Sequence, residues 1–121
     1  MNTLALAIIG HLVGDYLLQT DWQAAGKKKS SWICAVHCLL WTAAVVLLAG
    51  RAWWVWWVPV VLFATHFIQD RTNVIKWFME HCGQQQFAKP PMAPWSMIVV
   101  DNTFHLLALA IVAKALDGKW Y

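Results

Sequence analysis

Three apolar stretches of this chain each carry a histidine and an aspartate four residues apart. The pairs are His11/Asp15, His66/Asp70 and Asp101/His105, and a fourth apolar stretch carries His37 alone. Four residues make about one turn of an α-helix, so both members of a pair lie on one helix face. An aspartate at the centre of a membrane span costs about 2.5–3.5 kcal/mol on insertion scales. Three such aspartates therefore predict a shared polar site inside a helix bundle, and a metal ion is its expected occupant.

The composition is typical of a membrane protein. The 121 residues, enough for one domain, are 60% hydrophobic and 12% charged, and ten of them are tryptophan, whereas soluble domains are about 25% charged. The net charge of +3 comes mostly from loop lysines, so no nucleic-acid partner is expected. Cys34 and Cys38 lie in a predicted span and Cys82 in a predicted cytoplasmic loop, so no disulfide framework is expected.

Four hydrophobic stretches predict an all-α fold, an integral membrane four-helix bundle with an internal His/Asp site. The expected spans cover about residues 3–22, 31–50, 52–72 and 95–116 of a single domain, 1–121, and they are long enough to cross a bilayer. The first and third loops carry six Lys and Arg residues and the opposite side carries three. This excess places loops 1 and 3 in the cytoplasm of a bacterial inner membrane and both termini outside. The tryptophan-rich run 53–57 is expected to be an interfacial belt at the outer surface.

The order of the residues within each pair follows the direction of the expected spans. The first and third spans run inward and read His then Asp, whereas the fourth runs outward and reads Asp then His. Each pair therefore has its aspartate on the cytoplasmic side, and the ionisable groups of the helices meet at a common level. Gly10 and Gly14 lie beside the first pair and allow a neighbouring helix to approach closely.

The ionisable groups receive separate expected roles. The predicted metal ligands are His11, Asp15, His66, Asp70, Asp101 and His105. His37 has no carboxylate four residues away, so we predict that it transfers protons as the catalytic acid or base. Imidazole and carboxylate ligands favour Zn²⁺, with Fe²⁺ or Mn²⁺ as alternatives. The set exceeds a closed tetrahedral site, and it suits either one ion with open positions or two ions bridged by a carboxylate.

Residues 11–22, HLVGDYLLQTDW, and the lysine-rich turn after them resemble the opening of a domain-of-unknown-function family. That family comprises small multi-pass membrane proteins from bacteria and phages. The later groups around His37, His66 and Asp101 are similar to its other signature positions, so the resemblance covers nearly the whole chain. More distantly, the chain is similar to bacterial inner-membrane proteins for which metal-dependent hydrolysis is predicted. The resemblance implies a membrane setting and a polar site, and it leaves a phage origin open.

Three functions follow from these observations as expectations. The first is a metal-dependent hydrolase that acts at the inner membrane on a lipid or a phosphoester. The second is a homo-oligomeric channel or transporter in which the polar groups bind or conduct protons or a divalent cation. The third is a phage-type membrane interaction protein whose polar cluster is structural. A hydrolase requires a wet opening to the polar layer, whereas a transporter requires a route that continues past His11 and His105.

Overall fold

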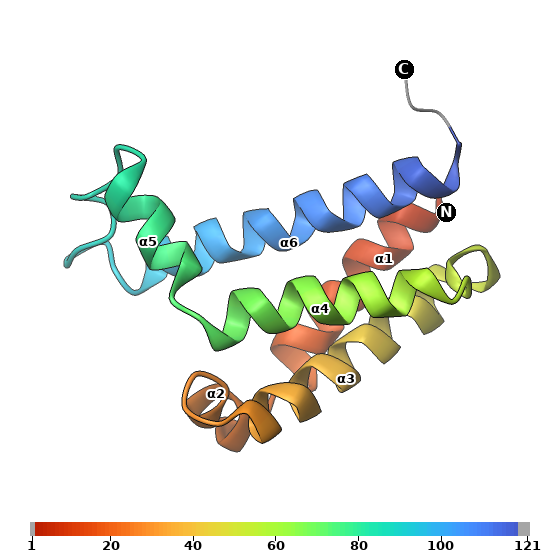
Figure 1. Cartoon of the computed structure of the whole chain (residues 1–121), viewed down its shortest axis with the longest axis horizontal. Helices are drawn as coiled ribbons and strands as arrows, with labels where there is room; N and C mark the ends of the chain where they lie inside the picture. Colours follow the sequence, from red (N-terminus) through yellow and green to blue (C-terminus); the bar gives the residue numbers. More distant parts are fainter. Residues whose placement is uncertain (1, 119–121) are drawn as a thin grey trace.

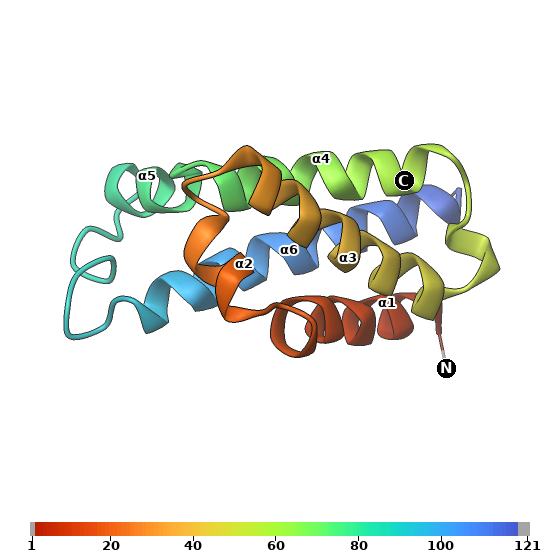
Figure 2. The same cartoon turned by 90° about the horizontal axis from the view of Figure 1, so that it is seen from below.

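The computed structural model describes residues 2–118, and within this range the protein is all-α, with no strand. The helical elements, in chain order, are α1 (Thr3–Leu12), the π-helical turn η1 (Val13–Leu17), α2 (Asp21–Gly26), α3 (Ser31–Ala49), the 3₁₀ turn η2 (Arg51–Trp53), α4 (Trp57–Arg71), α5 (Val74–His81) and α6 (Trp95–Leu116). The longer helices α1, α3, α4 and α6 run alternately in opposite directions along the molecule (Figure 1). Both views place the N-terminus and the end of α6 at one end, and α2 and α5 at the other (Figures 1 and 2).

Short polar side chains begin three of the helices. The side chains of Asn2, Thr20 and Ser30 accept hydrogen bonds from backbone N–H groups in the first turns of α1, α2 and α3. Such caps satisfy donors that have no partner within the helix. α3 ends at Gly50, whose φ of 87° lies in the left-handed region that glycine adopts without strain.

The helix bounds agree with the sequence pattern for two of the expected spans and differ for the other two. α3 and α6 cover nearly the expected ranges, 31–50 and 95–116. The first expected span, 3–22, is interrupted because Thr20 adopts an extended conformation and caps the separate helix α2. The third expected span, 52–72, begins with η2 and ends at Thr72, which is extended and separates α4 from α5. Trp53, expected in an interfacial belt, is instead buried in the core.

Within residues 2–118, two helices are long and apolar enough to cross a membrane, namely α3 and α6. The combined first helix, Thr3–Leu17, is apolar but shorter. Length and composition identify these helices as candidate membrane spans, and the multi-pass topology remains a prediction.

The first helix packs against α3 at unusually short range. A Cβ built on Gly10 would lie 2.6 Å from the Cα of Val45 and 2.8 Å from the carbonyl oxygen of Ala44. A Cβ on Gly14 would lie 2.6 Å from the ring of Trp41. Only glycine fits at these two positions, and this close approach brings the polar residues of the first helix next to those of α3.

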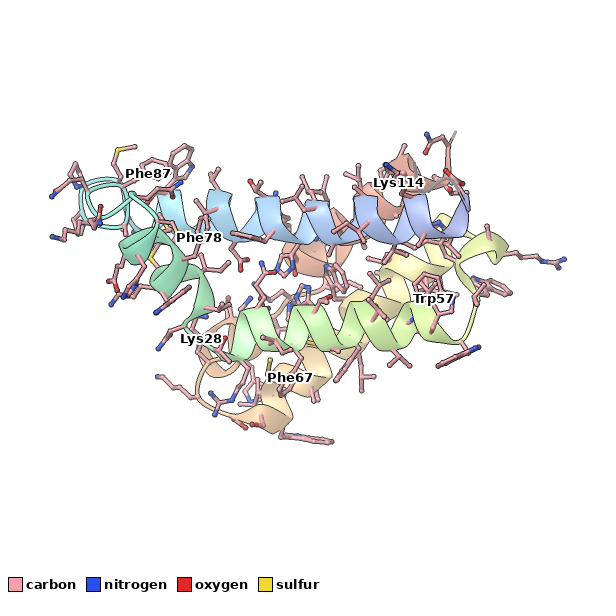
Figure 3. The ribbon with its side chains drawn as sticks, turned by 45° about the horizontal axis from the view of Figure 1, so that its top comes forward. Lys28, Trp57, Phe67, Phe78, Phe87 and Lys114 are labelled. Atoms are coloured by element: carbon pink, nitrogen blue, oxygen red, sulfur yellow. The ribbon has the colours of Figure 1, made fainter. Side chains whose placement is uncertain are left out.

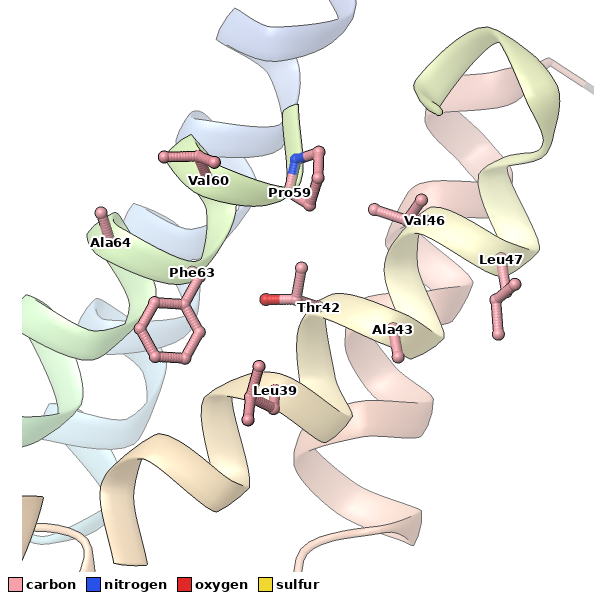
Figure 4. A pocket seen from close by; sticks show the side chains of 9 residues that line it. All are labelled: Leu39, Thr42, Ala43, Val46, Leu47, Pro59, Val60, Phe63 and Ala64. Atoms are coloured by element: carbon pink, nitrogen blue, oxygen red, sulfur yellow. The ribbon is translucent and has the colours of Figure 1, made fainter. Parts of the chain in front are cut away.

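Apolar side chains fill the half of the bundle nearer the termini. Its buried residues are Ala7, Trp41, Val45, Ala49, Trp53, Val58, Leu62, Leu109, Val112 and Ala113. On the outside of the bundle, α3 and α4 border an apolar groove of about 610 Å³. Figure 4 shows Leu39, Thr42 and Val46 of α3 opposite Pro59 and Phe63 of α4 in this groove. The other half of the bundle contains the polar residues.

Candidate metal centre

The seven ionisable side chains that the sequence singled out lie in the half of the bundle nearer α2 and α5. All four histidines and Asp70 are 0–2% exposed. Asp15 is 12% exposed and Asp101 is 30% exposed. The structure thus brings groups from α1/η1, α3, α4 and α6 into one cluster, in which Asp101 is the carboxylate most open to solvent.

A triangle of potential ligand atoms lies at the centre of this cluster. The Nε2 atoms of His37 and His66 are 3.1 Å apart, and each lies 3.1–3.2 Å from Oδ2 of Asp70. Oδ1 of Asp15 lies 3.2 Å from Nε2 of His37 and 3.5 Å from Nε2 of His66. A tetrahedron with metal–ligand bonds of about 2.0–2.1 Å has edges of about 3.3–3.4 Å. The observed separations are close to these edges, so the group could hold one Zn²⁺-sized ion.

Asp70 connects this triangle to a second group. Its Oδ2 faces His37 and His66, whereas its Oδ1 lies 3.5 Å from Nε2 of His105. That nitrogen is also 3.3 Å from Oδ2 of Asp101. The described residues contain three groups of potential ligands, and within each group the ligand atoms lie within 4.8 Å of one another. Asp70, Asp101 and His105 form one of these groups. A carboxylate with its two oxygens on different groups can bridge two ions or link a metal to a proton-transfer pair.

Neutral side chains orient several of these groups. Oε1 of Gln23 lies 3.2 Å from Nδ1 of His37, so Nδ1–H donates to it and the Nε2 lone pair faces the triangle. The Gln69 amide donates to both the side-chain and backbone oxygens of Asp101, at 2.9 and 2.6 Å. Metal-ligating histidines commonly donate their second N–H in this way, which fixes the tautomer and the ring orientation.

His11 makes contacts of a different kind. The indole N–H of Trp41 donates to Nδ1 of His11 at 3.1 Å. Since Nδ1 accepts, Nε2 carries the proton in the neutral ring and donates to Oδ1 of Asn102. Nδ1 of His11 also lies 3.5 Å from Oδ2 of Asp15. Both nitrogens of His11 are thus engaged in hydrogen bonds, with Trp41 and Asn102, which favours a positioning role beside Asp15 over a ligand role.

Asp15 lies in the only π-helical turn of residues 2–118. The N–H of Leu18 donates to the carbonyl of Val13 at 2.9 Å, a hydrogen bond that spans five residues instead of four. π-helical turns are rare and are found frequently at functional sites. The wider turn places Asp15 against groups of both α3 and α4, namely His37 and His66.

With all four histidines in the neutral form that binds a metal, the cluster has an excess of negative charge. With neutral histidines, Asp15, Asp70 and Asp101 contribute three negative charges, and Lys27, whose Nζ lies 2.8 Å from Oδ2 of Asp70, contributes one positive charge. The remaining charge of −2 equals that which one divalent cation neutralises. Three buried atoms of the cluster lack a hydrogen-bond partner among the described residues: Oδ1 of Asp15, Nδ1 of His66 and Nε2 of His105.

The structure adds residues that the sequence had left in a loop. Lys27 reaches Asp70, and Lys28 donates to the backbone carbonyls of Asp70 and Thr72 at 3.2 and 3.0 Å. Burial lowers the pKa of Lys27, but the neighbouring Asp70 carboxylate outweighs burial and raises the pKa above the usual lysine range. Gln23 and Lys27 have the same spacing of four residues as the His/Asp pairs. This spacing is the sequence signal that could have placed them in the cluster.

A cavity of about 220 Å³ connects the cluster to the surface. Its polar lining consists of Lys27, Lys28, Asp70 and Asp101, and its apolar lining consists of Ile75, Pro94, Met97 and Ile98. Figure 3 shows Lys28 at the end where α4 meets α5, and Lys114 and Trp57 at the opposite end. The polar cluster therefore opens on the side of α2 and α5.

A family model described as "Protein of unknown function (DUF3307)" matches residues 3–119, so the chain belongs to this family. No curated protein and no solved structure matches the chain. The match agrees with the expected domain-of-unknown-function family, and it assigns neither an activity nor a metal.

Proposed function

We propose that this member of the DUF3307 family is a metal-dependent hydrolase that acts at the membrane surface. The observation that carries the proposal is the buried triangle of His37, His66 and Asp70, of which Asp70 also lines a cavity with a charged rim. A catalytic metal site needs such ligands together with a position open to water.

The ligands of the proposed site are His37, His66 and Asp70, with Asp15 on the adjoining side. The sequence had suggested proton transfer for His37, but its Nε2 faces the other ligand atoms and its Nδ1–H is held by Gln23. These contacts favour a ligand role. Zn²⁺ suits two imidazoles with carboxylates, and Fe²⁺ and Mn²⁺ are alternatives of similar ligand preference.

A bound divalent ion would polarise the substrate and lower the pKa of a coordinated water to near neutrality. We assign proton transfer to Asp101, which lines the cavity, is 30% exposed and is held by the Gln69 amide. Asp101 accepts the proton of the attacking water as the new bond to the substrate forms. As the ester bond breaks, the leaving oxygen receives that proton. His105, between Asp101 and Asp70, orients the carboxylate.

The channel or transporter alternative differs from the hydrolase in what the apolar half of the bundle should contain. Conduction through this chain needs polar groups beyond His11 and His105, but the buried residues there include Leu62, Val45 and Leu109. This apolar core argues against conduction through a single bundle, and it leaves open a pore on the axis of a homo-oligomer. We also propose a multi-pass topology in the bacterial inner membrane with α2 and α5 on the cytoplasmic side, supported by the apolar helices and the lysine-rich turn.

Metal analysis of the full chain in detergent tests the proposal. We expect about one equivalent of Zn²⁺ per chain, because one ion neutralises the excess charge of the cluster. His66→Ala should weaken binding by at least about 100-fold, since it removes a buried ligand, whereas His81→Ala, at an exposed site outside the cluster, should have no effect. Asp101→Asn should retain the metal and lose turnover of ester substrates. A wild-type chain that binds no divalent metal would overturn the proposal and favour a purely structural cluster.

A further inference from the structure

The cavity beside the candidate metal centre combines two ammonium groups and the carboxylates of Asp70 and Asp101 with an apolar wall. Lys27 and Lys28 contribute the ammonium groups, and both also contact Asp70. The apolar wall comes from Ile75 of α5 and from Met97 and Ile98 of α6, with Pro94 at the start of that helix. A ligand that satisfies both surfaces must carry a negative group next to a hydrocarbon group.

We propose that this cavity binds the phosphate group of an ester whose alcohol part is a hydrocarbon chain. The inference rests on the proposed function and adds the substrate class. It follows from the juxtaposition of unused lysine N–H donors, the candidate metal ligand Asp70 and an apolar wall within one opening.

The donor count fits a phosphate. An ammonium group has three donors, and Lys27 uses one of them on Asp70, while Lys28 uses two on backbone carbonyls. Among the described residues no further acceptor engages these two groups, so three N–H donors remain for a ligand. A phosphate monoester offers three strong acceptor oxygens and a charge of about −1.5 to −2 at neutral pH. A carboxylate can also accept three hydrogen bonds, but it carries one charge and interacts more weakly with two ammonium groups than a phosphate monoester does.

The size of the cavity limits how much of the ligand can enter. Pockets that enclose a drug-sized ligand measure about 300–1,000 Å³, whereas this cavity measures about 220 Å³. It therefore accommodates a phosphate and the first carbons of a chain, and the rest of the chain must lie outside. Ile98, which is 51% exposed, and Trp95, which is 61% exposed, extend the apolar surface beyond the opening along α6. This arrangement fits an amphiphile better than a water-soluble phosphate.

Calorimetric titration of the full chain in detergent tests the inference with three probes: hexyl phosphate, inorganic phosphate and hexanol. We expect hexyl phosphate to bind at least tenfold more tightly than inorganic phosphate, and hexanol to give no measurable binding. Equal affinities for the two phosphates would overturn the amphiphilic substrate and indicate a site for free phosphate. Binding of hexanol as tight as that of hexyl phosphate would overturn phosphate recognition altogether.

Variants locate the binding. Lys28→Met and Lys27→Met should each weaken hexyl phosphate binding by about tenfold, whereas Lys29→Met, the exposed neighbour outside the cavity lining, should stay within twofold of wild type. Lys27→Met also leaves the buried Asp70 carboxylate without its cation, which can unfold the protein. Lys28→Met is therefore the decisive variant, and wild-type affinity for hexyl phosphate in Lys28→Met would overturn the inference. Each titration is repeated on metal-depleted protein. Retention of lysine-dependent binding there separates phosphate recognition from the metal proposal, which the metal analysis tests independently.

Discussion

The same four helices build two halves of the bundle with opposite chemistry. Along the first helix, Ala7 is followed by His11 and Asp15, and along α4, Leu62 is followed by His66 and Asp70. Successive turns of one helix face therefore pass from the apolar core to the polar cluster. The apolar half is closed and gains stability from burial, whereas the polar half opens through a cavity near α2 and α5.

The apolar half helps to offset the free-energy cost of burying the ionisable groups of the polar half. Trp41 lies at the boundary, since it belongs to the apolar core and its indole N–H donates to His11. Its ring centroid is also 4.1 Å from that of His66. The apolar half fixes the relative positions of the helices, and the polar half uses those positions to hold groups that repel one another. Variants in the two halves should therefore fail in different ways.

A carboxylate placed in the apolar half should have the largest effect. Leu62→Asp removes packing worth about 2–5 kcal/mol and buries a charge without a partner, which costs several kcal/mol more. Because total stabilities are about 5–15 kcal/mol, we expect loss of the folded protein, read as loss of the monodisperse peak in size-exclusion chromatography. Leu62→Met, of similar volume, should fold normally, and a folded Leu62→Asp protein would contradict the closed apolar half.

Removal of the proposed metal ion should have the next largest effect, confined to the polar half. A ligand present at 100 to 1,000 times its Kd stabilises the folded state by about 2.7–4.1 kcal/mol. We expect a chelator to lower the free energy of unfolding of the wild-type protein by about this amount, measured by denaturant titration. His66→Ala should already lack this contribution and should respond to the chelator by less than about 0.5 kcal/mol. An equal response from both proteins would place the metal elsewhere.

Gly10→Ala tests the contact that holds the first helix against α3 in both halves. The new methyl group would meet the backbone of Val45 and Ala44, and overpacking of this kind costs about 1–3 kcal/mol. We expect this loss in denaturant titrations. Truncation of the neighbouring side chain in Val45→Ala should not restore stability, because the clash is with backbone atoms. Recovery in the double variant would show that the helices can move apart at this point.

Trp41→Phe tests the boundary between the halves. It keeps an aromatic ring but removes the donor to Nδ1 of His11, and a buried acceptor left without a partner costs about 1–3 kcal/mol. Trp54→Phe is the matched control, since the indole N–H of Trp54 donates to the carbonyl of Val46 at an exposed position. We expect a loss of about 1 kcal/mol for Trp41→Phe and less than about 0.5 kcal/mol for Trp54→Phe. Equal losses of stability in the two variants would show that the hydrogen bond from Trp41 to His11 contributes no more than an exposed one.

Deprotonation of Lys27 beside Asp70 should have the smallest effect, a loss of stability at alkaline pH. Burial disfavours the charged form of Lys27, but Asp70, with smaller contributions from Asp15 and Asp101, raises its pKa in the folded protein. A group whose pKa is raised on folding stabilises fully below the unfolded value and loses that contribution as the pH rises through the folded value. The loss should therefore begin above about pH 10.4, the ordinary lysine pKa. Denaturant titrations from pH 8 to pH 11.5 should show this decline in wild type and a flatter profile in Lys27→Met.

Spacing and hydrophobicity predicted the all-α architecture and the meeting of the seven ionisable groups, because both follow from the period of an α-helix. The interruption of the first expected span was not predicted, because apolar side chains continue to Leu18 and the break depends on Thr20 capping a new helix. The π-helical turn at Asp15 was not predicted either, since its sequence suits an ordinary helix and packing selects the wider turn.

The reach of Lys27 into the cluster depends on where α2 returns the chain. A loop lysine of ordinary appearance carries no local sign of such a contact. Trp53 was expected at the surface from its neighbours in a tryptophan-rich run, but the 3₁₀ turn η2 directs its side chain inward. Both differences arise from tertiary packing, which local patterns do not contain.

In the proposed membrane setting, the unequal lengths of the helices have a consequence for the surrounding lipid. The Thr3–Leu17 helix and α4 each contain 15 residues, and at about 1.5 Å per residue they reach about 22 Å, whereas α6 with 22 residues reaches about 33 Å. A hydrocarbon layer of about 30 Å would exceed the two short helices, so lipid next to them must thin or tilt its chains. Such a dimple would lower nearby headgroups toward Asp15 and Asp70, and for the proposed hydrolase it would shorten the path of an ester out of the bilayer.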